Sequence, residues 1–327
     1  MMQISPEIQL FIREHSSDDV RVLALQAKKY PDIDMPTVIT QIAGRKVAAE
    51  KIPSWWEIEK IWYPKHLSLE QCSSEITARY KARLLQGDSL TDLTGGFGID
   101  CSFLATGFKS ATYVERQEEL CEIAAHNFPV LNLNHINIKN EDGVTYLQAM
   151  SPVDCLFLDP ARRNEHGGKT VAISDCEPNV AELEELLLQK ANRVMIKLSP
   201  MLDLSLALKE LKQTQEVHIL SVNNECKELL ILLGQTSPAE ISIHCVNLFT
   251  KGTQKEQHFV FTREQEQCSE CTYTDSLETY LYEPNASLLK AGAFRSIAAA
   301  YPVRKLHPNS HLYTSDTFIE NFPGRIF

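Results

Sequence analysis

The sequence lacks long apolar segments and an excess of positive charge. No run approaches the roughly 18 apolar residues that a membrane-spanning helix needs, so we expect no membrane partner. Residues 1–13 include Glu7 and have no basic head followed by an apolar block, which argues against a secretory signal and favours the cytoplasm. The formal net charge of −11 argues against indiscriminate binding of polyanions, but it leaves room for a local basic patch.

The nine cysteines form no framework of disulfides or zinc ligands. In a reducing compartment they are expected to be free thiols. Cys268 and Cys271 make one C-x-x-C pair, but no second pair and no histidine pair stands at zinc-finger spacing. We therefore expect no metal.

Apolar residues recur at helical spacing through residues 1–66, where Pro31, Pro36 and Pro53 divide the pattern into short pieces. This pattern predicts a helical N-terminal region. The aromatic cluster at 55–63 is more typical of a core between helices than of a platform for stacking bases. At 327 residues and 43% hydrophobic, the chain can bury cores in two or three domains.

A glycine-rich turn occupies residues 90–100, with the sequence Leu-Thr-Asp-Leu-Thr-Gly-Gly-Phe-Gly-Ile-Asp. A short apolar run meets glycines that can take positive φ, and an amphipathic segment follows, which predicts strand, tight turn and helix start. Such a turn presents bare backbone and free N–H groups to a ligand. Upstream, a helix is expected from Ser68, as N-cap, to about residue 85, with a small polar face that includes Lys81.

Strands and helices then alternate. Strands are expected at 111–115, 136–140, 153–159 and 193–198, with helices at 118–128 and 180–190 between some of them. Apolar strands separated by helices predict a parallel, doubly wound sheet. The strands at 217–222 and 228–233 are separated only by residues 223–227, too few for a crossover helix, so they must pair antiparallel.

These patterns predict an α/β protein with three parts. Residues 1–66 form the helical N-terminal region, and residues 67–235 form a Rossmann-like doubly wound sheet of seven strands whose last strand is antiparallel. Residues 236–327 form a small α+β domain with strands at 240–249 and 258–262 and a helix at 286–294. Between 285 and 327, Asp316 and Glu320 are outnumbered by the basic residues Lys290, Arg295, Arg304, Lys305 and Arg325.

Carboxylates follow four successive strands of the predicted sheet: Asp92, Glu115, Asp142 and Asp159. Ligands of open α/β sheets bind at the carboxyl ends of the strands. Glu115 stands 23 residues after Asp92, where a carboxylate reaches the hydroxyls of a ribose, and Asp142 is placed to accept from an adenine amino group. The pattern favours a pocket for an adenosine compound.

The turn also discriminates among adenosine compounds. A dinucleotide turn would have glycine where Cys101 stands, and no Walker loop is present. Asp92, just before the turn, would repel a pyrophosphate but help to position a cation. S-adenosylmethionine carries a sulfonium and an amino group and no phosphate.

The pattern Asp92-x-Thr94-x-Gly96-x-Gly98-x-Asp100, with Asp159-Pro160 and the antiparallel last strand, resembles the class I S-adenosylmethionine-dependent methyltransferases over about residues 68–235. Thr94 replaces the first glycine of the commonest motif, as in a similar turn of small-subunit rRNA guanine-N2 methyltransferases. The resemblance implies that S-adenosylmethionine is the cofactor. It implies cofactor contacts from Asp92, Thr94, Gly95, Gly96, Phe97, Gly98, Glu115, Arg116 and Asp142.

Asp159-Pro160-Ala161-Arg162-Arg163 stands where amino-methylating members carry Asp-Pro-Pro-Tyr. Asp159 and the Pro160 carbonyl would accept hydrogen bonds from a planar amine and turn its lone pair toward the sulfonium methyl. Arg162 replaces the aromatic residue that would stack on a base, so Arg162 and Arg163 are candidates to stack on the base or hold phosphate. Ion pairing within the fold is the alternative, and the acceptor atom, nitrogen or carbon, stays open.

Residues 282–286 and 290–294 resemble the THUMP-like domain that follows a methyltransferase core in a group of bacterial proteins, and residues 71–82 resemble the same group. THUMP domains bind RNA. The resemblance thus implies methylation of a base exocyclic amine, guanine N2-like, in structured RNA, either tRNA or rRNA. Two alternatives remain: an NAD-dependent oxidoreductase, and a non-catalytic RNA-binding protein with a vestigial pocket. The oligomeric state stays open.

Overall fold

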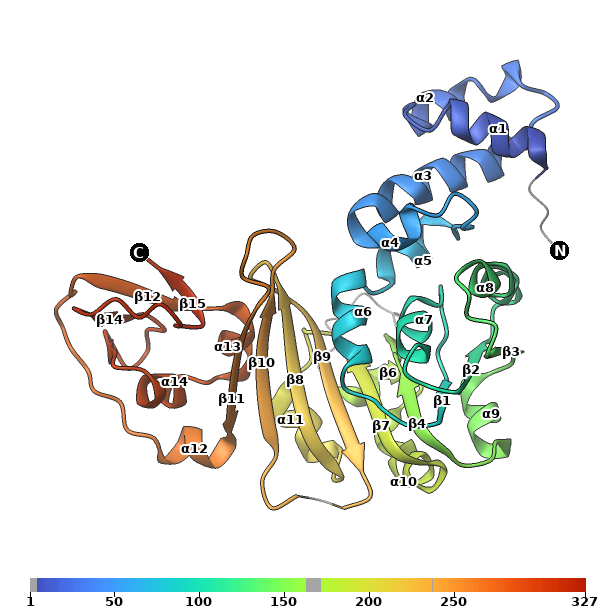
Figure 1. Ribbon diagram of the computed structural model, residues 1–327. Coiled ribbons are helices and arrows are strands. Elements are labelled where there is room, and N and C mark those ends of the chain that lie inside the picture. The colour runs from blue at the N-terminus through green and yellow to red at the C-terminus, as the bar shows by residue number, and fades with distance from the viewer. Residues whose placement is uncertain (1–4, 163–171, 237) are drawn as a thin grey trace. The chain divides into compact units, whose positions relative to one another are not determined.

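The computed structural model describes residues 5–162, 172–236 and 238–327 (Figure 1). The chain divides into two compact units, Met1–Cys155 and Leu156–Phe327, and strand β4 (Val153–Leu158) crosses the boundary. Among the described residues, no helix is both long and apolar enough to cross a membrane.

The first unit begins with the short helices expected from the sequence. They are α1 (Pro6–Glu14), α2 (Val20–Leu25), the 3-10 turn η1 (Ala27–Lys29), α3 (Met35–Lys51) and α4 (Pro53–Trp56). Prolines stand in the first turn of α1, α3 and α4, where the missing N–H costs nothing. A small core joins α1, α2 and the first half of α3 through Phe11, Leu23, Met35, Val38 and Ile42.

A second core joins the later N-terminal residues to the glycine turn. Trp55 and Tyr63 are buried in it with Phe97 and Ile99, whereas Trp56 is 41% exposed, so the expected core role holds for only part of the aromatic cluster. The Trp55 and Phe97 rings meet edge to face, 5.1 Å apart. The N-terminal region therefore supports the turn directly.

The prediction of one continuous helix from Ser68 to about residue 85 is wrong. The structure has α5 (His66–Gln71) and α6 (Glu75–Ala82), with extended backbone at Cys72 and Ser74 between them. Ser68 lies inside α5 and caps nothing. The break places the Ser73 hydroxyl 2.7 Å from a carboxylate oxygen of Asp100, so a tertiary hydrogen bond outweighs local helical propensity.

The sheet of the first unit is parallel, as expected. Strands β1 (Ser89–Asp92), β2 (Ser110–Glu115) and β3 (Ile136–Asn140) pair in parallel, in the order β4-β1-β2-β3. The helices of this part are α7 (Ile99–Ala105), α8 (Glu118–Val130) and α9 (Gly143–Ala149). The carboxyl ends of these strands carry Asp92, Glu115 and the segment before Asp142.

The second unit contains the antiparallel strand that the short connection predicted. Its strands include β7 (Ala191–Leu198), β8 (Thr214–Val222) and β9 (Glu225–Gly234), with helices α10 (Val180–Lys190) and α11 (Leu204–Glu210). β9 pairs antiparallel with both β7 and β8. Asn223 and Asn224 have φ of 50° and 67°, the left-handed geometry of a tight two-residue hairpin turn.

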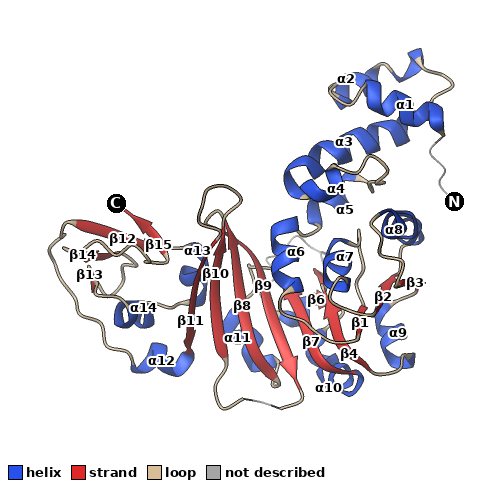
Figure 2. Cartoon of the chain, viewed as in Figure 1, coloured by secondary structure: helices blue, strands red, loops and turns tan. Residues whose placement is uncertain are grey.

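Two further strands extend this sheet. β10 (Ser242–Leu248) pairs parallel with β8, and β11 (Glu256–Thr262) pairs antiparallel with β10. Among the described residues of the second unit the strand order is β11-β10-β8-β9-β7-β4, so this sheet contains two strands, β10 and β11, beyond those that the sequence indicated for it (Figure 2). Both strands were expected, but in the separate C-terminal domain.

The C-terminal residues form a smaller sheet. Its strands pair antiparallel, in the order β13-β14-β12-β15. The elements are α12 (Arg263–Cys268), β12 (Tyr280–Pro284), α13 (Ala286–Ala291), α14 (Arg295–Ala300), β13 (Arg304–Lys305), β14 (Tyr313–Ser315) and β15 (Gly324–Ile326). Asn285 caps α13, and Gly292 at φ 75° ends it before the expected residue 294. α13 packs against β8, β9 and β10.

Candidate functional site

The glycine turn between β1 and α7 is built so that glycine is required. A Cβ at Gly95 would lie 2.2 Å from the ring of Tyr113, while the Gly95 N–H donates to the carbonyl of Val114 at 2.8 Å. Gly96 and Gly98 have φ of 55° and 87°. A Cβ at Gly96 would approach only the Thr94 carbonyl, at 3.7 Å, so the backbone there is open to a ligand.

Two buried carboxylates hold this turn. Asp92 is 1% exposed, and its Oδ1 accepts from the backbone N–H of Thr94 at 3.0 Å. Glu115 is 8% exposed; its Oε2 accepts from the Gly96 N–H and its Oε1 from the Gln117 N–H, both at 2.8 Å. Because an ionised carboxylate has about four acceptor positions, Glu115 has capacity for further hydroxyl donors.

The remaining predicted cofactor residues of the first unit are placed differently. Asp142 is exposed and caps α9, accepting from the N–H groups of Val144 and Thr145 at 3.0 Å each. The Phe97 side chain is buried in the core, so only its backbone faces the turn, and Arg116 is exposed. A Cβ at Gly143 would lie 2.2 Å from the Leu93 carbonyl, so the start of α9 lies against the end of β1.

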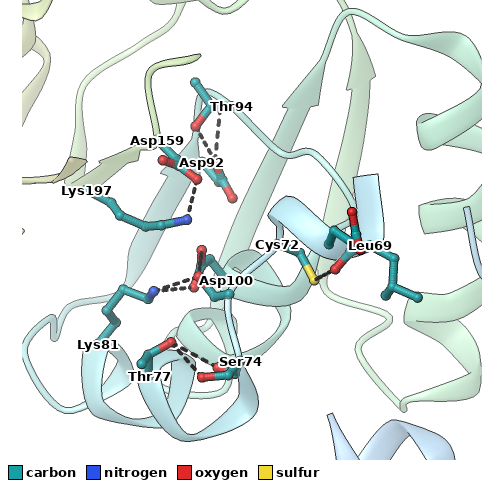
Figure 3. A network of polar contacts seen from close by, with 12 residues as sticks. Leu69, Cys72, Ser74, Thr77, Lys81, Asp92, Thr94, Asp100, Asp159 and Lys197 are labelled. Carbon is teal, nitrogen blue, oxygen red and sulfur yellow. Dashed lines mark hydrogen bonds and ion pairs between the residues drawn. The ribbon is translucent and has the colours of Figure 1, made fainter. Parts of the chain in front are cut away.

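A buried ion pair beside the turn was missed in the sequence. Lys81 of α6 is fully buried, and its Nζ lies 2.9 Å from a carboxylate oxygen of Asp100, in the first turn of α7 (Figure 3). The same Nζ donates to the Ser73 hydroxyl at 2.8 Å. The available signal was the position of Lys81 on a small polar helix face just before the motif, but this position alone does not identify an ion-pair partner.

The thiol inside the motif is not a nucleophile. Cys101 is fully buried on α7, and burial together with the neighbouring carboxylates of Asp92 and Asp100 raises its pKa well above the usual range. A thiol held protonated at neutral pH is inert. The chemistry of this turn is therefore that of hydrogen bonding and charge.

In the second unit, Asp159 follows β4 and forms an ion pair with Lys197 of β7 (Figure 3). The Lys197 side chain is largely buried, and Asp159 is about one-third exposed. The pair fixes the direction of the carboxylate and places a cation at the predicted acceptor site. Lys197 lies within the strand expected at 193–198, and a lysine inside an apolar strand generally needs a partner.

The segment after Pro160 is paired rather than open. β5 (Ala161–Arg162) pairs antiparallel with β6 (Cys176–Glu177), just after the 3-10 turn η2 (Ile173–Asp175). This pairing fixes the backbone that follows Asp159. The Arg162 side chain and the whole of Arg163 lie outside the described residues.

The basic groups of residues 285–327 are used within the fold. The Lys290 ammonium donates to the Leu202 carbonyl at 2.7 Å, and Lys305 is buried. Arg304 pairs with Glu278, and Arg325 lies 3.7 Å from Glu283. Arg295 donates to the Gln267 carbonyl at 3.4 Å. The basic side chains of this region therefore contact carbonyl and carboxylate groups of the same chain.

Comparison with solved structures shows the family of this chain. A candidate methyltransferase from Porphyromonas gingivalis W83 matches with 36% identity and a TM-score of 0.85 over 98% of this chain and 80% of that chain. The chain belongs to the family of that protein. A family model described as a ferredoxin-like domain matches residues 280–323, within the small C-terminal sheet.

More distant matches are much weaker. The modification subunit of a proposed type I restriction enzyme from Vibrio vulnificus YJ016 matches at 12% identity and a TM-score of 0.42, over 62% of this chain and 56% of that chain. No curated protein matches the sequence significantly.

Proposed function

We propose that this protein is an S-adenosylmethionine-dependent methyltransferase. The observation that carries the proposal is the glycine turn, in which Glu115 binds the Gly96 N–H and Asp92 binds the Thr94 N–H. Bare backbone at Gly96 leaves room for a ligand, and two buried carboxylates favour a cationic one without phosphate. Family membership with a candidate methyltransferase supports the same activity.

In this proposal residues 92–98 hold the methionine end, Glu115 the ribose and Asp142 the adenine, with Arg116 at the rim. Asp142 already accepts two backbone hydrogen bonds as a helix cap, so its second carboxylate oxygen is the one assigned to the adenine amino group. S-adenosylmethionine would supply an electrophilic methyl group on its sulfonium.

The acceptor role falls to Asp159 and Pro160. Asp159 and the Pro160 carbonyl would accept the N–H groups of a planar amine, which turns the nitrogen lone pair toward the methyl carbon. With the nitrogen held in this way, it would accept the methyl group as the sulfur–carbon bond breaks, the thioether S-adenosylhomocysteine would be released, and the extra proton on nitrogen would pass to water. Lys197 acts as a positioning residue, because it holds the carboxylate in one direction.

For the acceptor we propose an exocyclic base amine, guanine N2-like, of tRNA or rRNA. The support is the Thr94 variant of the turn and the Asp159-Pro160 sequence, with Arg162 and Arg163 stacking on the base or holding phosphate. If the C-terminal residues bind RNA as a THUMP-like domain, Arg304 and Arg325 must release their ion-pair partners, Glu278 and Glu283, and bind phosphate instead. We therefore expect RNA binding to weaken steeply as salt is raised.

The Lys197–Asp159 pair also favours a second candidate, a non-catalytic RNA-binding protein, since the ammonium group competes with the acceptor amine for the same carboxylate. Calorimetry with S-adenosylhomocysteine tests the pocket, and absence of binding would refute both its assignment and the methyltransferase proposal. Incubation with labelled S-adenosylmethionine and total RNA separates the candidates, because label enters RNA only if the site turns over. Quenching of NADH fluorescence would instead indicate the oxidoreductase.

A further inference from the structure

Three histidines and a glutamate gather on one face of the second unit's sheet, apart from any residue assigned above. Glu216 and His218 lie on β8, His244 on β10 and His258 on β11. His218 and His244 are direct partners in the parallel pairing of β8 with β10. Glu216 is two residues before His218, so both side chains leave the same face of β8.

The donor atoms of this group converge. One ligand atom each from Glu216, His218 and His244 lies within 4.8 Å of the others. His218 Nε2 is 3.3 Å from a carboxylate oxygen of Glu216, and His244 Nδ1 is 3.1 Å from His258 Nε2. The rings of His218 and His244 stack at 4.3 Å, with 16° between their planes.

Burial is graded across the group. His218 is 2% exposed, Glu216 and His244 are half-buried, and His258 is exposed. A small ion would therefore have a path from solvent past His258 to the inner donors. A metal site needs a route by which the ion can enter as well as ligands, and this group of side chains has both.

The donor atoms are of the kinds that bind transition metals. His218 and His244 each offer an imidazole nitrogen, and Glu216 offers a carboxylate oxygen.

Arg193 places a positive charge beside Glu216, but it contacts the carboxylate oxygen that does not contact His218. Its Nη2 lies 2.9 Å from Glu216 Oε1, whereas the contact with His218 is made by Oε2. An outer hydrogen bond of this kind orients a carboxylate ligand, as partners of metal ligands commonly do.

We propose that Glu216, His218 and His244 bind one divalent transition-metal ion, with His258 as the outer ligand. Two or three imidazoles and one carboxylate suit zinc, copper or nickel, while magnesium and calcium prefer oxygen-only sets. Ligands of tetrahedral zinc lie about 3.3 Å apart, so the group closes on the ion by small side-chain rotations. The bound ion would tie β8, β10 and β11 together, and this inference does not rest on the proposed function.

The test uses the full-length protein, stripped with a chelator and titrated with zinc alone against a chromogenic chelator. We expect one zinc ion per chain. His244→Ala should weaken zinc binding by more than the roughly 10–100-fold lost with an outer-sphere partner. Zinc should raise the melting temperature of the wild type and not that of the variant.

The matched control is Cys268→Ser with Cys271→Ser, which removes the C-x-x-C pair and should leave zinc binding unchanged. A cobalt-loaded sample should show visible ligand-field bands without a sulfur charge-transfer band. Three outcomes would each overturn the proposal. The first is equal zinc binding by the wild type and His244→Ala, and the second is a sulfur band that disappears in the cysteine variant. The third is no zinc binding by the wild type. Folding of His244→Ala is checked by circular dichroism, and His258→Ala, at an exposed position, gives a second variant that should weaken binding.

Discussion

Glu115 braces the glycine turn and, in the proposed function, also binds the cofactor, so its substitution should act on both. We expect Glu115→Ala to weaken S-adenosylhomocysteine binding about 10- to 100-fold, the equivalent of one or two hydrogen bonds to a charged group. Calorimetry measures the loss. Glu115→Gln keeps an acceptor for the Gly96 N–H and should lose less.

Glu118→Ala is the control, because Glu118 is an exposed residue in the first turn of α8. Its binding of S-adenosylhomocysteine should match the wild type. Equal affinities for Glu115→Ala and wild type would remove Glu115 from the cofactor site.

Lys197 offers a way to separate positioning from cofactor binding. Lys197→Met should cut kcat by at least about tenfold, since Asp159 loses the cation that fixes its direction, while cofactor affinity stays unchanged. Lys197→Arg should recover part of the rate because it keeps the charge. Single-turnover transfer of labelled methyl groups measures this.

A surface pair provides the comparison. Lys227 and Glu225 form an exposed ion pair in the same unit, which we expect to contribute little, so Lys227→Met should leave kcat unchanged. If Lys197→Met transferred methyl groups at the wild-type rate, its role as a positioning residue would be wrong.

At the scale of elements, the turn between β1 and α7 tolerates side chains at some glycines and not others. Gly95→Ala would drive a methyl group into the ring of Tyr113, whereas Gly107→Ala, at the end of α7, meets nothing closer than 3.7 Å. We expect the first to lose at least about 1–3 kcal/mol of unfolding free energy and most cofactor binding, and the second to lose neither. Urea unfolding and calorimetry would show the contrast.

The carboxylate of Asp154, on β4, holds the start of β1. Asp154 accepts from the N–H of Asp88 at 2.8 Å and from the N–H and hydroxyl of Ser89 at 2.9 and 3.0 Å. These hydrogen bonds hold the pKa of Asp154 below its usual range. Asp154→Ala should therefore lower the unfolding free energy by about 1–2 kcal/mol at pH 7.

The pH dependence of that loss has a defined sign. Because the pKa is lower in the folded than in the unfolded protein, the stabilisation is present above the unfolded value of about 3.9 and disappears as pH falls through the folded value. The difference between wild type and variant should begin to shrink near pH of about 3.9 and be smallest below the folded value. A difference that grew on acidification would contradict this account.

Strand positions and strand direction were accessible from the sequence because they depend on local patterns. Apolar runs marked the seven core strands, and the short link after Val222 required an antiparallel partner. Contacts between distant segments were not accessible: the pairing of Lys197 with Asp159 and the break at Ser73 depend on which strands and helices are neighbours. The histidine group was hidden for the same reason, since His218, His244 and His258 belong to three strands.

For the whole molecule, the two N-terminal cores predict different effects of truncation. Deleting residues 1–34 removes α1 and α2 but leaves Trp55 and Tyr63 against the turn, so we expect S-adenosylhomocysteine binding to persist. Deleting residues 1–66 uncovers Phe97 and Ile99 and should abolish it. Binding curves and melting curves of the two deletion variants would show which core supports the turn. Full affinity for S-adenosylhomocysteine in the variant that lacks residues 1–66 would contradict the role of the second core.

The domain limits at residues 66 and 235 remain predictions. The shared core of Trp55 and Phe97 ties the N-terminal region to the turn, and β10 and β11 join the sheet rather than the small antiparallel one. Apolar alternation located those two strands, but it carries no information on which sheet they enter.

The central position of β9 has a consequence during synthesis on the ribosome. β9 pairs with both β7 and β8, yet it is made after them, so a nascent chain that stops at Asn224 has an unpaired edge on β7 and no partner for β8. Such a chain is a template for intermolecular pairing until about ten more residues emerge. Premature termination in this short window should yield aggregates rather than a smaller folded protein.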